Sequence, residues 1–374
     1  MNLLYFSPVA WQSYAQRPHY LIRHLIQTGC VDRVLWVDPY ATRLPQLADL
    51  FRKRGADRLP GPFQLPGLQV LDPVAWPVEP LPGGSWINHI VNWKKIRNSL
   101  QEFSSVTDEK LIIGAGRPHA LALWALDKFK SVASFYDAMD DFSAFYTGLS
   151  NISMESSERR MARNVSKVWC SSRAIQNRLQ RLNTNTVYLP NAYDMTHLVP
   201  STKCVRDNTE NLVIGYVGTI GEWFNWESVV RLARAEIRNQ IQIIGPCFKN
   251  PPGLPENVLL HPACSHTDAI HRICDFDICL IPFKINRLTR SVDPIKYYEY
   301  RAMGKPILST RFGTMSEHAK KGGVLFFEEC NMQDCCARAL SIRPNVGEVE
   351  LFRQENDWSV RLDGIVKWIK SYYN

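Results

Sequence analysis

Ser291–Thr310, which reads SVDPIKYYEYRAMGKPILST, contains the signals for a helix start, a helix stop and a following strand. Asp293 can cap the free amides of a helix, and Pro294 suits the first helical position because it has no N–H group. Gly304 is typical of the left-handed residue that ends a helix, and a proline two residues later prevents the helix from continuing. The apolar run Ile307–Ser309 then predicts a short buried strand.

Two charged residues of this predicted helix suggest a binding site. Lys296 lies in the first turn, and Glu299 follows three residues later on the same face. A helix N-terminus beside a lysine attracts an anion, and a carboxylate one turn further on can accept hydrogen bonds from the hydroxyls of a sugar or ribose. On an arbitrary helix, a cap at Asp293 and a solvated pair of charges would be the better explanation. The place of this helix in the chain favours the binding site.

The chain alternates short apolar runs with longer amphipathic runs, which is the pattern of parallel sheets covered by helices on both faces. Two series of such runs predict an α/β fold with two Rossmann-like domains that face each other across a cleft. We expect a first domain over 1–195, a second over 196–355, and a final helix over 356–374 that crosses back to the first domain. The predicted strands are Leu3–Phe6, Val34–Val37, Leu68–Leu71, Leu111–Ile113, Val132–Tyr136, Val168–Cys170, Val187–Leu189, Leu212–Val217, Ile241–Ile244, Val258–Leu260, Asp277–Ile281, Ile307–Ser309 and Val324–Phe326.

Length and composition are those of a soluble globular protein. The 374 residues exceed one ordinary core, and 45% hydrophobic with 21% charged residues is the usual balance. No apolar run approaches the roughly 20 residues that span a bilayer, and the first residues lack the basic leader of a secretory signal. The net charge of +8 suggests acidic partners, but the basic residues are dispersed and no nucleic-acid-reading motif is visible. We therefore expect a cytoplasmic protein that does not bind nucleic acid.

One segment of the first domain, Trp86–Phe103, combines apolar residues at helical spacing with the basic residues Lys94, Lys95 and Arg97. The interpretation that we favour is a surface helix packed on the sheet. The alternative is a basic amphipathic helix on anionic lipid, which the nearby basic stretch Arg52–Arg58 supports. The sequence thus leaves open a peripheral contact with the cytoplasmic face of the inner membrane.

The ten cysteines are scattered without paired spacing, and those inside strand-like runs, such as Cys170 and Cys279, are predicted to be buried thiols. One cluster has the chemistry of metal ligands but no common zinc spacing. We therefore expect no metal site. This cluster consists of His261, Cys264, His266, His271 and Cys274.

A glycine-containing turn follows the predicted strand Leu212–Val217. Gly218, Thr219 and Gly221 would let backbone amides approach a phosphate closely, although this turn is not the dinucleotide-binding fingerprint. The first strand of the chain is followed by Ser7–Trp11, which contains no glycine. The absence of a glycine fingerprint there argues against a nicotinamide dehydrogenase of the usual type.

Acidic residues follow another predicted strand, within Phe135–Phe145. Asp137, Asp140 and Asp141 come where parallel sheets place their sites, just beyond the carboxyl end of a strand. A carboxylate there could act as general base towards a sugar hydroxyl. The alternative is that one or two of them cap the next helix, and for Asp141 this is equally plausible.

Two further groups of polar residues are candidate site residues, one in each predicted domain. Gln16, Arg17 and His19 follow the first strand and should face the crevice on the acceptor side. Arg287 and Arg290 precede the Ser291–Thr310 stretch and could reach a diphosphate, or could equally be solvated loop residues.

These segments together resemble the GT-B glycosyltransferases, enzymes with two Rossmann-like domains that move a sugar from a nucleotide donor to an acceptor. The resemblance covers most of the chain, and it is greatest for bacterial enzymes of surface-polysaccharide assembly, of the teichuronic-acid, capsule or O-antigen kind. The chain is also similar to family 4 and to the xanthan-type glucuronosyltransferases. The order and spacing of the matching segments carry the resemblance: AQRPHYL (15–21), YDAMDDFSAF (136–145), CSSRAIQNRL (170–179), LPNAYD (189–194), VIGYVGTIGEWFNWE (213–227), DFDICLIPF (275–283) and the Ser291–Thr310 stretch.

The resemblance implies roles for several residues. In this family the donor nucleotide binds mostly to the C-terminal domain. Lys296 matches a lysine that contacts the donor phosphates, and Glu299 matches a position near the ribose. Gly218 and Thr219 match the loop after the first strand of that domain.

One departure from the family pattern bears on mechanism. Many retaining members carry two glutamates separated by seven residues, the second at the place of Glu299, and the first would then fall at Ser291. Some inverting relatives of the xanthan type have an aspartate at the place of Asp140, which serves as the base, and a lysine at the place of Lys296. We therefore favour inversion with Asp140 as the base, with retention as the alternative.

The resemblance implies a metal-independent glycosyltransferase without a cofactor. Its donor would be a nucleoside diphosphate sugar, most simply a UDP-sugar. Its acceptor would be a lipid-diphosphate-linked saccharide or an oligosaccharide in surface polysaccharide biosynthesis. The alternatives are a nucleotide-sugar epimerase with the same fold and a catalytically silent nucleotide-sugar-binding subunit.

Overall fold

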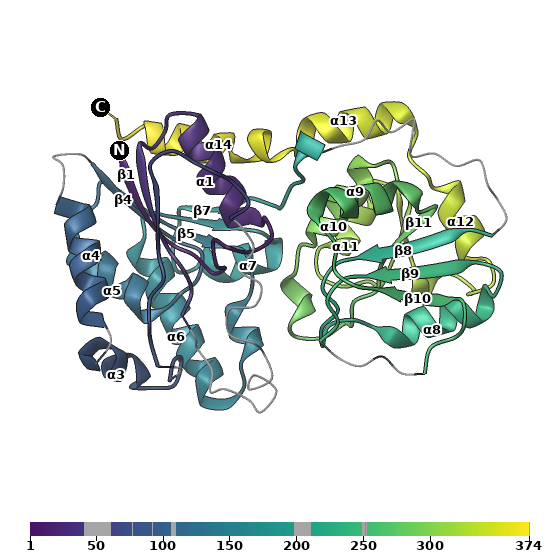
Figure 1. Cartoon of the computed structure of the whole chain (residues 1–374), viewed down its shortest axis with the longest axis horizontal. Helices are drawn as coiled ribbons and strands as arrows, with labels where there is room; N and C mark the ends of the chain where they lie inside the picture. Colours follow the sequence, from purple (N-terminus) through teal and green to yellow (C-terminus); the bar gives the residue numbers. More distant parts are fainter. Residues whose placement is uncertain are drawn as a thin grey trace. The chain divides into compact units, whose positions relative to one another are not determined.

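The computed structural model describes residues 1–40, 61–76, 78–91, 93–105, 110–197, 211–248, 251 and 253–373. The chain forms two compact units, shown in Figure 1: unit 1 comprises Met1–Leu189 and Leu362–Asn374, and unit 2 comprises Pro190–Arg361. The chain therefore enters unit 2 before the expected boundary at residue 195, and residues 356–361 also belong to unit 2. The basic stretch Arg52–Arg58 lies outside the described residues.

Unit 1 contains a parallel sheet of seven strands in the described part of the chain, in the order β3-β2-β1-β4-β5-β6-β7. Its strands are apolar because helices cover both faces of the sheet (Figure 1). At the centre, Leu4 of β1 pairs with Leu35 of β2 on one side and with Ile113 of β4 on the other. The strands are β1 (Asn2–Phe6), β2 (Arg33–Val37), β3 (Leu68–Leu71), β4 (Leu111–Ala115), β5 (Ala133–Ala138), β6 (Lys167–Cys170) and β7 (Thr186–Tyr188).

The helices of unit 1 follow the strands in sequence. A short 3-10 turn, η1 (Phe142–Phe145), comes between β5 and the next helix. The helices are α1 (Arg17–Gln27), α3 (Gly84–Val91), α4 (Trp93–Ser105), α5 (Ala120–Lys128), α6 (Gly148–Asn164) and α7 (Arg173–Leu179), and most of α14 (Trp358–Lys370) also belongs to this unit.

Unit 2 contains a second parallel sheet, with six strands among the described residues, in the order β10-β9-β8-β11-β12-β13. Ile214 of β8 pairs with Ile241 of β9 and with Ile278 of β11, so the centre of this sheet is again apolar. The strands are β8 (Val213–Val217), β9 (Gln240–Ile244), β10 (Val258–His261), β11 (Ile278–Ile281), β12 (Ile307–Ser309) and β13 (Val324–Phe326). The helices are α8 (Trp226–Ala235), α9 (His266–Asp275), α10 (Ile295–Ala302), α11 (Met315–Ala319), α12 (Cys335–Ser341) and α13 (Val346–Asn356), and the 3-10 turns are η2 (Met195–His197), η4 (Thr289–Ser291) and η5 (Phe327–Glu329).

The α/β fold with two parallel sheets confirms the expectation from the sequence. All thirteen predicted strands are present, with ends that differ by at most two residues. The strand order of each sheet reverses next to its first strand, between β1 and β4 in unit 1 and between β8 and β11 in unit 2. Ligands of such sheets bind outside the carboxyl ends of the strands at this reversal.

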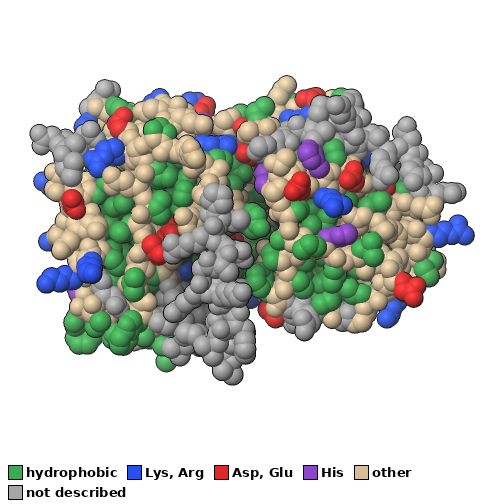
Figure 2. All heavy atoms as spheres, in the orientation of Figure 1, with side chains coloured by type: hydrophobic (Ala, Val, Ile, Leu, Met, Phe, Trp, Pro, Cys, Tyr) green, Lys and Arg blue, Asp and Glu red, His purple; other side chains and the backbone are tan. Residues whose placement is uncertain are grey.

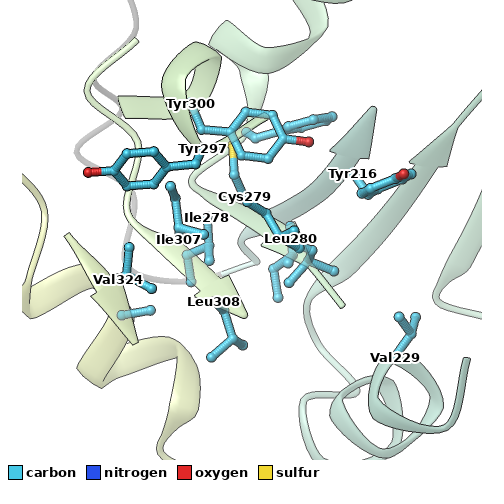
Figure 3. Packing of buried hydrophobic residues seen from close by; sticks show 14 of the residues in the cluster. Tyr216, Val229, Ile278, Cys279, Leu280, Tyr297, Tyr300, Ile307, Leu308 and Val324 are labelled. Carbon is cyan, nitrogen blue, oxygen red and sulfur yellow. The ribbon is translucent and has the colours of Figure 1, made fainter. Parts of the chain in front are cut away.

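Helix α10, which Ser291–Thr310 predicts, packs its buried side chains into the core of unit 2. Figure 3 shows Tyr297 and Tyr300 of α10 beside the strand residues Ile278 and Ile307. The helix ends as expected: Gly304 has φ = +71°, its N–H donates to the carbonyl of Arg301, and the N–H after it donates to the carbonyl of Tyr300. This pair of bonds satisfies carbonyls that a helix end would otherwise leave open.

The predicted helix over 86–103 is two helices with different surroundings. Helix α4 packs on the sheet, as the favoured interpretation states, and buries Trp93, Ile96, Leu100 and Phe103. Helix α3 instead exposes its large apolar side chains. Trp86 is 68% exposed and Ile90 is 56% exposed.

Candidate functional site

The loops after β8 and β9 meet at two glycines. Gly218 has φ = +147° and Gly245 has φ = +142°, a region that favours glycine. The N–H of Gly218 donates to the carbonyl of Ile244 (2.8 Å), and a Cβ atom on Gly245 would lie 2.8 Å from the carbonyl carbon of Gly218. Neither loop therefore has room for a side chain at this point. Sequence reasoning singles out Gly218 and misses Gly245, although Gly245 also directly follows an apolar strand.

Lys296 lies against the bare backbone of Gly218. A Cβ atom on Gly218 would be 2.5 Å from the Nζ atom of Lys296, so the lysine side chain uses the space that the glycine leaves. The same Nζ atom lies 5.6 Å from the ring centroid of Tyr216, over its face. The side chain is partly exposed. The structure thus brings a lysine of α10 to the carboxyl end of β8.

Two tyrosine hydroxyls hold the loop after β8 in place. The hydroxyl of Tyr216 donates to the carbonyl of Thr219 (2.9 Å), and the hydroxyl of Tyr300 accepts the N–H of Val217 (3.1 Å). In Figure 3, Tyr300 of α10 points its hydroxyl towards β8, whereas Tyr297 points the opposite way. Burial and then the carboxylate of Glu299 raise the pKa of Tyr216. These tyrosines are site residues that sequence reasoning misses; the position of Tyr300, directly after Glu299, was the available signal.

Asp293 does not cap α10, so this prediction is wrong. The N-cap residue is Pro294, and no side chain of the described residues caps the helix. The Asp293 carboxylate is buried and accepts hydrogen bonds from His318 (2.7 Å), Thr314 (2.8 Å) and the N–H of Asn191 (2.7 Å). Burial alone would raise the pKa of Asp293, but these hydrogen bonds lower it below its usual range. The hydroxyl of Tyr298 is a fourth donor (3.0 Å), and this buried network satisfies the carboxylate better than one helix end would.

The first turn of α10 is therefore free of a side-chain cap and carries Lys296. Backbone amides at a helix start and a lysine beside them are both donors to an anion. Glu299, partly exposed one turn later, lies on the same side of the helix, as the sequence predicts. Ser291, the position where retaining relatives carry a glutamate, is buried, and its hydroxyl has no hydrogen-bond partner among the described residues.

The other predicted donor residues occupy nearby loops. Thr219 is partly exposed in the loop after β8. Gly221 is buried, and a Cβ atom there would meet the ring of Trp223 at 2.6 Å. Arg287 and Arg290 are exposed between β11 and α10, so their contact with a donor stays a prediction.

Arg17 and Asp137 form a buried ion pair in unit 1. Each side chain is 1% exposed. The guanidinium of Arg17 donates to both carboxylate oxygens of Asp137 (2.7–3.0 Å) and to the carbonyl of Leu189 (2.8 Å). A pair enclosed in this way ties α1 to β5 and to the end of β7. The structure therefore gives these two residues a structural role, and their contact with an acceptor stays a prediction.

His19 is also enclosed. Its Nδ1 atom accepts the N–H of Gln16 (3.1 Å), so Nε2 carries the proton and faces the carbonyls of Ala10 (3.2 Å) and Trp11 (3.3 Å). Burial lowers the pKa of His19 to about 4, which keeps the ring neutral. Gln16, partly exposed, is the N-cap residue of α1. His19 thus fixes the loop after β1, and of these two residues only Gln16 has an accessible side chain.

The two aspartates after β5 differ. Asp141 accepts a hydrogen bond from Ser143 (2.7 Å), and its carboxylate lies 3.6 Å from the guanidinium of Arg178. It precedes η1, but its side chain does not cap that turn. Asp140 is partly exposed at the carboxyl end of β5, which is where a base for an acceptor hydroxyl is expected.

Two kinds of feature are absent from the described residues. No group of three or more His, Cys, Asp or Glu side chains is placed to hold a metal ion. In the same part of the chain, no helix combines the length and the apolar character needed to cross a membrane.

Solved structures of glycosyltransferases match both units in one alignment. Sucrose-phosphate synthase from Thermosynechococcus elongatus aligns over 100% of this chain and 99% of its own, with a TM-score of 0.70 and 12% identity. Anabaena HepE, solved in complex with UDP-glucose, aligns over 99% of both chains with a TM-score of 0.64 and 14% identity. The lipopolysaccharide outer core galactosyltransferase WaaB aligns over 99% of both chains, with a TM-score of 0.63 and 11% identity. The chain has the GT-B fold.

Sequence comparison adds one relative with a name from surface-polysaccharide assembly. The TuaH protein of Bacillus subtilis, whose name assigns it to teichuronic acid biosynthesis as a glycosyltransferase, is 23% identical over 207 residues. The match covers 50% of this chain and 52% of TuaH, so the chain spans about half the length of this curated relative. No protein-family model matches the chain. The solved structures confirm the expected GT-B fold. The match to TuaH confirms the resemblance to glycosyltransferases of surface-polysaccharide assembly.

Proposed function

We propose that this protein is a glycosyltransferase that moves a sugar from a UDP-sugar to a saccharide acceptor in bacterial surface-polysaccharide biosynthesis. The single observation that carries the proposal is the contact between Lys296 and Gly218. It sets a cation against bare backbone at the strand-order reversal of unit 2, where GT-B enzymes hold their nucleotide donor.

The donor side of the reaction uses unit 2. The uncapped start of α10 and the Lys296 ammonium group would bind the diphosphate, and Gly218 would let a phosphate oxygen come close to the backbone. Glu299, one turn further along the same helix, would accept hydrogen bonds from the ribose hydroxyls. HepE is solved with UDP-glucose, and this supports a UDP-sugar as the donor.

The chemical step uses Asp140 as the base. Its carboxylate would take the proton of the acceptor hydroxyl while the hydroxyl oxygen attacks the anomeric carbon. The bond between that carbon and the diphosphate oxygen breaks, and Lys296 with the α10 amides would stabilise the negative charge on the departing UDP. These steps invert the anomeric configuration of the transferred sugar. Inversion is supported by Ser291, which leaves no carboxylate at the place used by retaining relatives.

The positive charge of Lys296 bears on whether the reaction needs a metal ion. A lysine and a helix N-terminus supply the positive charge that a metal ion supplies in other transferases. The proposed reaction therefore uses no metal and no cofactor.

The proposed acceptor is a saccharide linked to a lipid diphosphate, in a pathway of the teichuronic-acid, capsule or O-antigen kind. The name of TuaH supports the pathway. The exposed apolar side chains of α3, Trp86 and Ile90, would lie against the acyl region of the inner membrane from its cytoplasmic face. Figure 2 shows hydrophobic side chains gathered at the lower left, where Figure 1 places α3. Two exposed lysines at the start of α4, Lys94 and Lys95, would meet anionic headgroups.

The test measures sugar transfer from a panel of UDP-sugars to a lipid-diphosphate-linked saccharide. The release of UDP reports the rate of transfer. Lys296→Met keeps the apolar stem of the side chain and removes its charge. We expect it to lower kcat by about 10²–10³-fold, the usual cost of removing one donor to developing charge. Lys321→Ala, at an exposed lysine after α11, is the matched control and should transfer sugar at the wild-type rate.

Wild-type-like transfer by Lys296→Met would remove the lysine from its role. An isomerised UDP-sugar formed without acceptor would indicate an epimerase instead. Tight UDP-sugar binding with no turnover across acceptors would indicate a silent binding subunit.

A further inference from the structure

Unit 1 contains a pocket that none of the proposed catalytic residues lines. Its walls come from residues 79–85 before and at the start of α3, from Pro118–Ala120 between β4 and α5, and from one face of α6. The pocket is open at its mouth, and its cavity volume is about 70 Å³. The pocket follows β4, which pairs with β5, so it lies at the same sheet edge as Asp140.

Glu79 provides a fixed acceptor in this pocket. Its side chain is 6% exposed and accepts the hydroxyl of Tyr40 (2.7 Å), the amide of Asn88 (3.4 Å) and the N–H of Ala120 (3.4 Å). Ala120 is the first residue of α5, so the carboxylate of Glu79 occupies the helix N-terminus that could otherwise attract an anion. An anionic ligand would be repelled here, whereas a hydroxyl could donate to the carboxylate.

His119 provides a donor that has no acceptor among the described residues. Its Nδ1 atom accepts the N–H of Ala122 (3.3 Å), so the proton is on Nε2. The residue is 5% exposed, and Nε2 has no hydrogen-bond partner among the described residues. Burial lowers the pKa of His119 to about 3, which keeps the ring neutral. A buried N–H without an acceptor destabilises the folded protein, so a ligand oxygen at this atom would be favourable.

Three serines complete the lining. Ser153 and Ser157 are one helical turn apart on α6, and Ser85 lies at the start of α3. All three are partly exposed. A carboxylate, an imidazole N–H and three hydroxyls offer both donors and acceptors at close range, which is the chemistry that recognises a neutral ring with several hydroxyl groups.

We infer that this pocket binds an uncharged sugar unit of the acceptor saccharide, with His119 donating to one ring or hydroxyl oxygen and Glu79 accepting from a hydroxyl. The inference rests on the proposed function for the identity of that saccharide as acceptor. The mouth of the pocket is apolar: Leu81 on its wall is 44% exposed, and the exposed apolar residues of α3 begin one residue after Ser85. This apolar rim is consistent with an acceptor that carries a lipid.

The experiment measures direct binding and steady-state transfer in the full chain. Binding of methyl β-D-glucopyranoside, N-acetylglucosamine and glucuronate is followed by saturation-transfer NMR. His119→Phe keeps an aromatic ring and removes the N–H. Ser157→Leu fills the pocket from a partly exposed position, and Ser156→Leu places the same side chain on the adjacent exposed position of α6.

We expect the neutral glycosides to bind more tightly than glucuronate, which Glu79 repels. His119→Phe and Ser157→Leu should weaken neutral glycoside binding and raise the acceptor KM at least tenfold, with the KM for the UDP-sugar unchanged. Ser156→Leu should match the wild type in both measurements. Neutral glycoside signals that persist in both pocket variants would overturn the inference.

A separate readout distinguishes this inference from the proposed function. UDP should raise the melting temperature of the wild type and of every variant, because it binds unit 2. If UDP binds and sugar is transferred while the pocket variants keep the wild-type acceptor KM, only the pocket assignment fails. If no UDP-sugar supports transfer, the proposed function fails, and glycoside binding still decides whether the pocket is a saccharide site.

Discussion

The Nζ atom of Lys296 lies 2.5 Å from the position that a Cβ atom on Gly218 would occupy. The two residues are far apart in the sequence, one after β8 and the other in the first turn of α10. The contact exists because α10 follows β11, the strand that pairs with β8. One residue without a side chain and one charged residue thus form the centre of the proposed donor site.

The first prediction concerns Gly218→Ala. The methyl group would displace the flexible end of Lys296, and the φ of +147° would cost about 1–3 kcal/mol in any L residue. We expect UDP affinity to fall at least tenfold, measured by calorimetry. Gly253→Ala is the control, because a Cβ atom there meets nothing within 4 Å and should leave UDP binding unchanged. Equal UDP affinity in wild type and Gly218→Ala would show that the lysine position does not matter.

The second prediction concerns Asp140→Asn. General base catalysis contributes typically 10²–10⁴-fold, so kcat should fall by about that factor while the KM for the UDP-sugar stays near the wild-type value. Asp141→Asn is the comparison, since Asp141 is held by Ser143 near Arg178, and it should retain most of kcat. The measurement is steady-state transfer with both substrates varied. A parallel rise in the donor KM would instead indicate a binding role for Asp140.

The third prediction concerns pH and Asp293. Hydrogen bonds lower the pKa of Asp293 in the folded protein, so its contribution to stability is present above about pH 3.9, the usual unfolded value, and is lost as pH falls below it. Asp293→Asn should lower the free energy of unfolding of unit 2 at pH 7. The difference from the wild type should shrink towards pH 3. Urea unfolding at several pH values measures this difference, and a gap that stays constant with pH would contradict the account.

The fourth prediction concerns the buried pair Arg17–Asp137. Removing one partner of such a pair leaves a buried charge and costs about 3–5 kcal/mol, so Arg17→Met should strongly destabilise unit 1. Replacing both partners, in Arg17→Met with Asp137→Leu, should recover much of the loss. Urea unfolding measures the stability of each variant. If the pair is structural, as its enclosure indicates, the folded double variant keeps the wild-type acceptor KM; a raised KM would restore the acceptor role expected from the sequence.

The sequence predicts most of the fold because its strands are apolar runs bounded by turn residues. The strands of both sheets follow from these runs, and Gly304 with the proline after it marks the end of α10 correctly. The split of the helical pattern over 86–103 into α3 and α4 could not be predicted, because periodicity does not show which apolar side chains find a surface to cover.

The candidate site was only partly predictable, since contacts between distant segments depend on tertiary packing. Lys296 and Gly218 could be singled out separately, but not their contact. Asp293 has the local signature of a cap, and a distant histidine, His318, captures it instead. The charged residues Arg17 and Asp137 follow strands as site residues do, yet they neutralise each other inside unit 1. Sequence position indicates which edge of a sheet a side chain approaches, and it does not indicate whether that side chain reaches water.

Helix α14 has a consequence for the order in which the two units can finish folding. It packs Trp368 against Trp169 of β6 at 5.2 Å and buries Ile369 and Leu362, so unit 1 needs residues from both ends of the chain. Domains usually fold in the order in which they leave the ribosome. The ribosome adds about 5–20 residues per second. Here unit 2 is one continuous segment, Pro190–Arg361, and it can be complete while unit 1 still lacks its last helix. The half of the protein that is made first is therefore finished last.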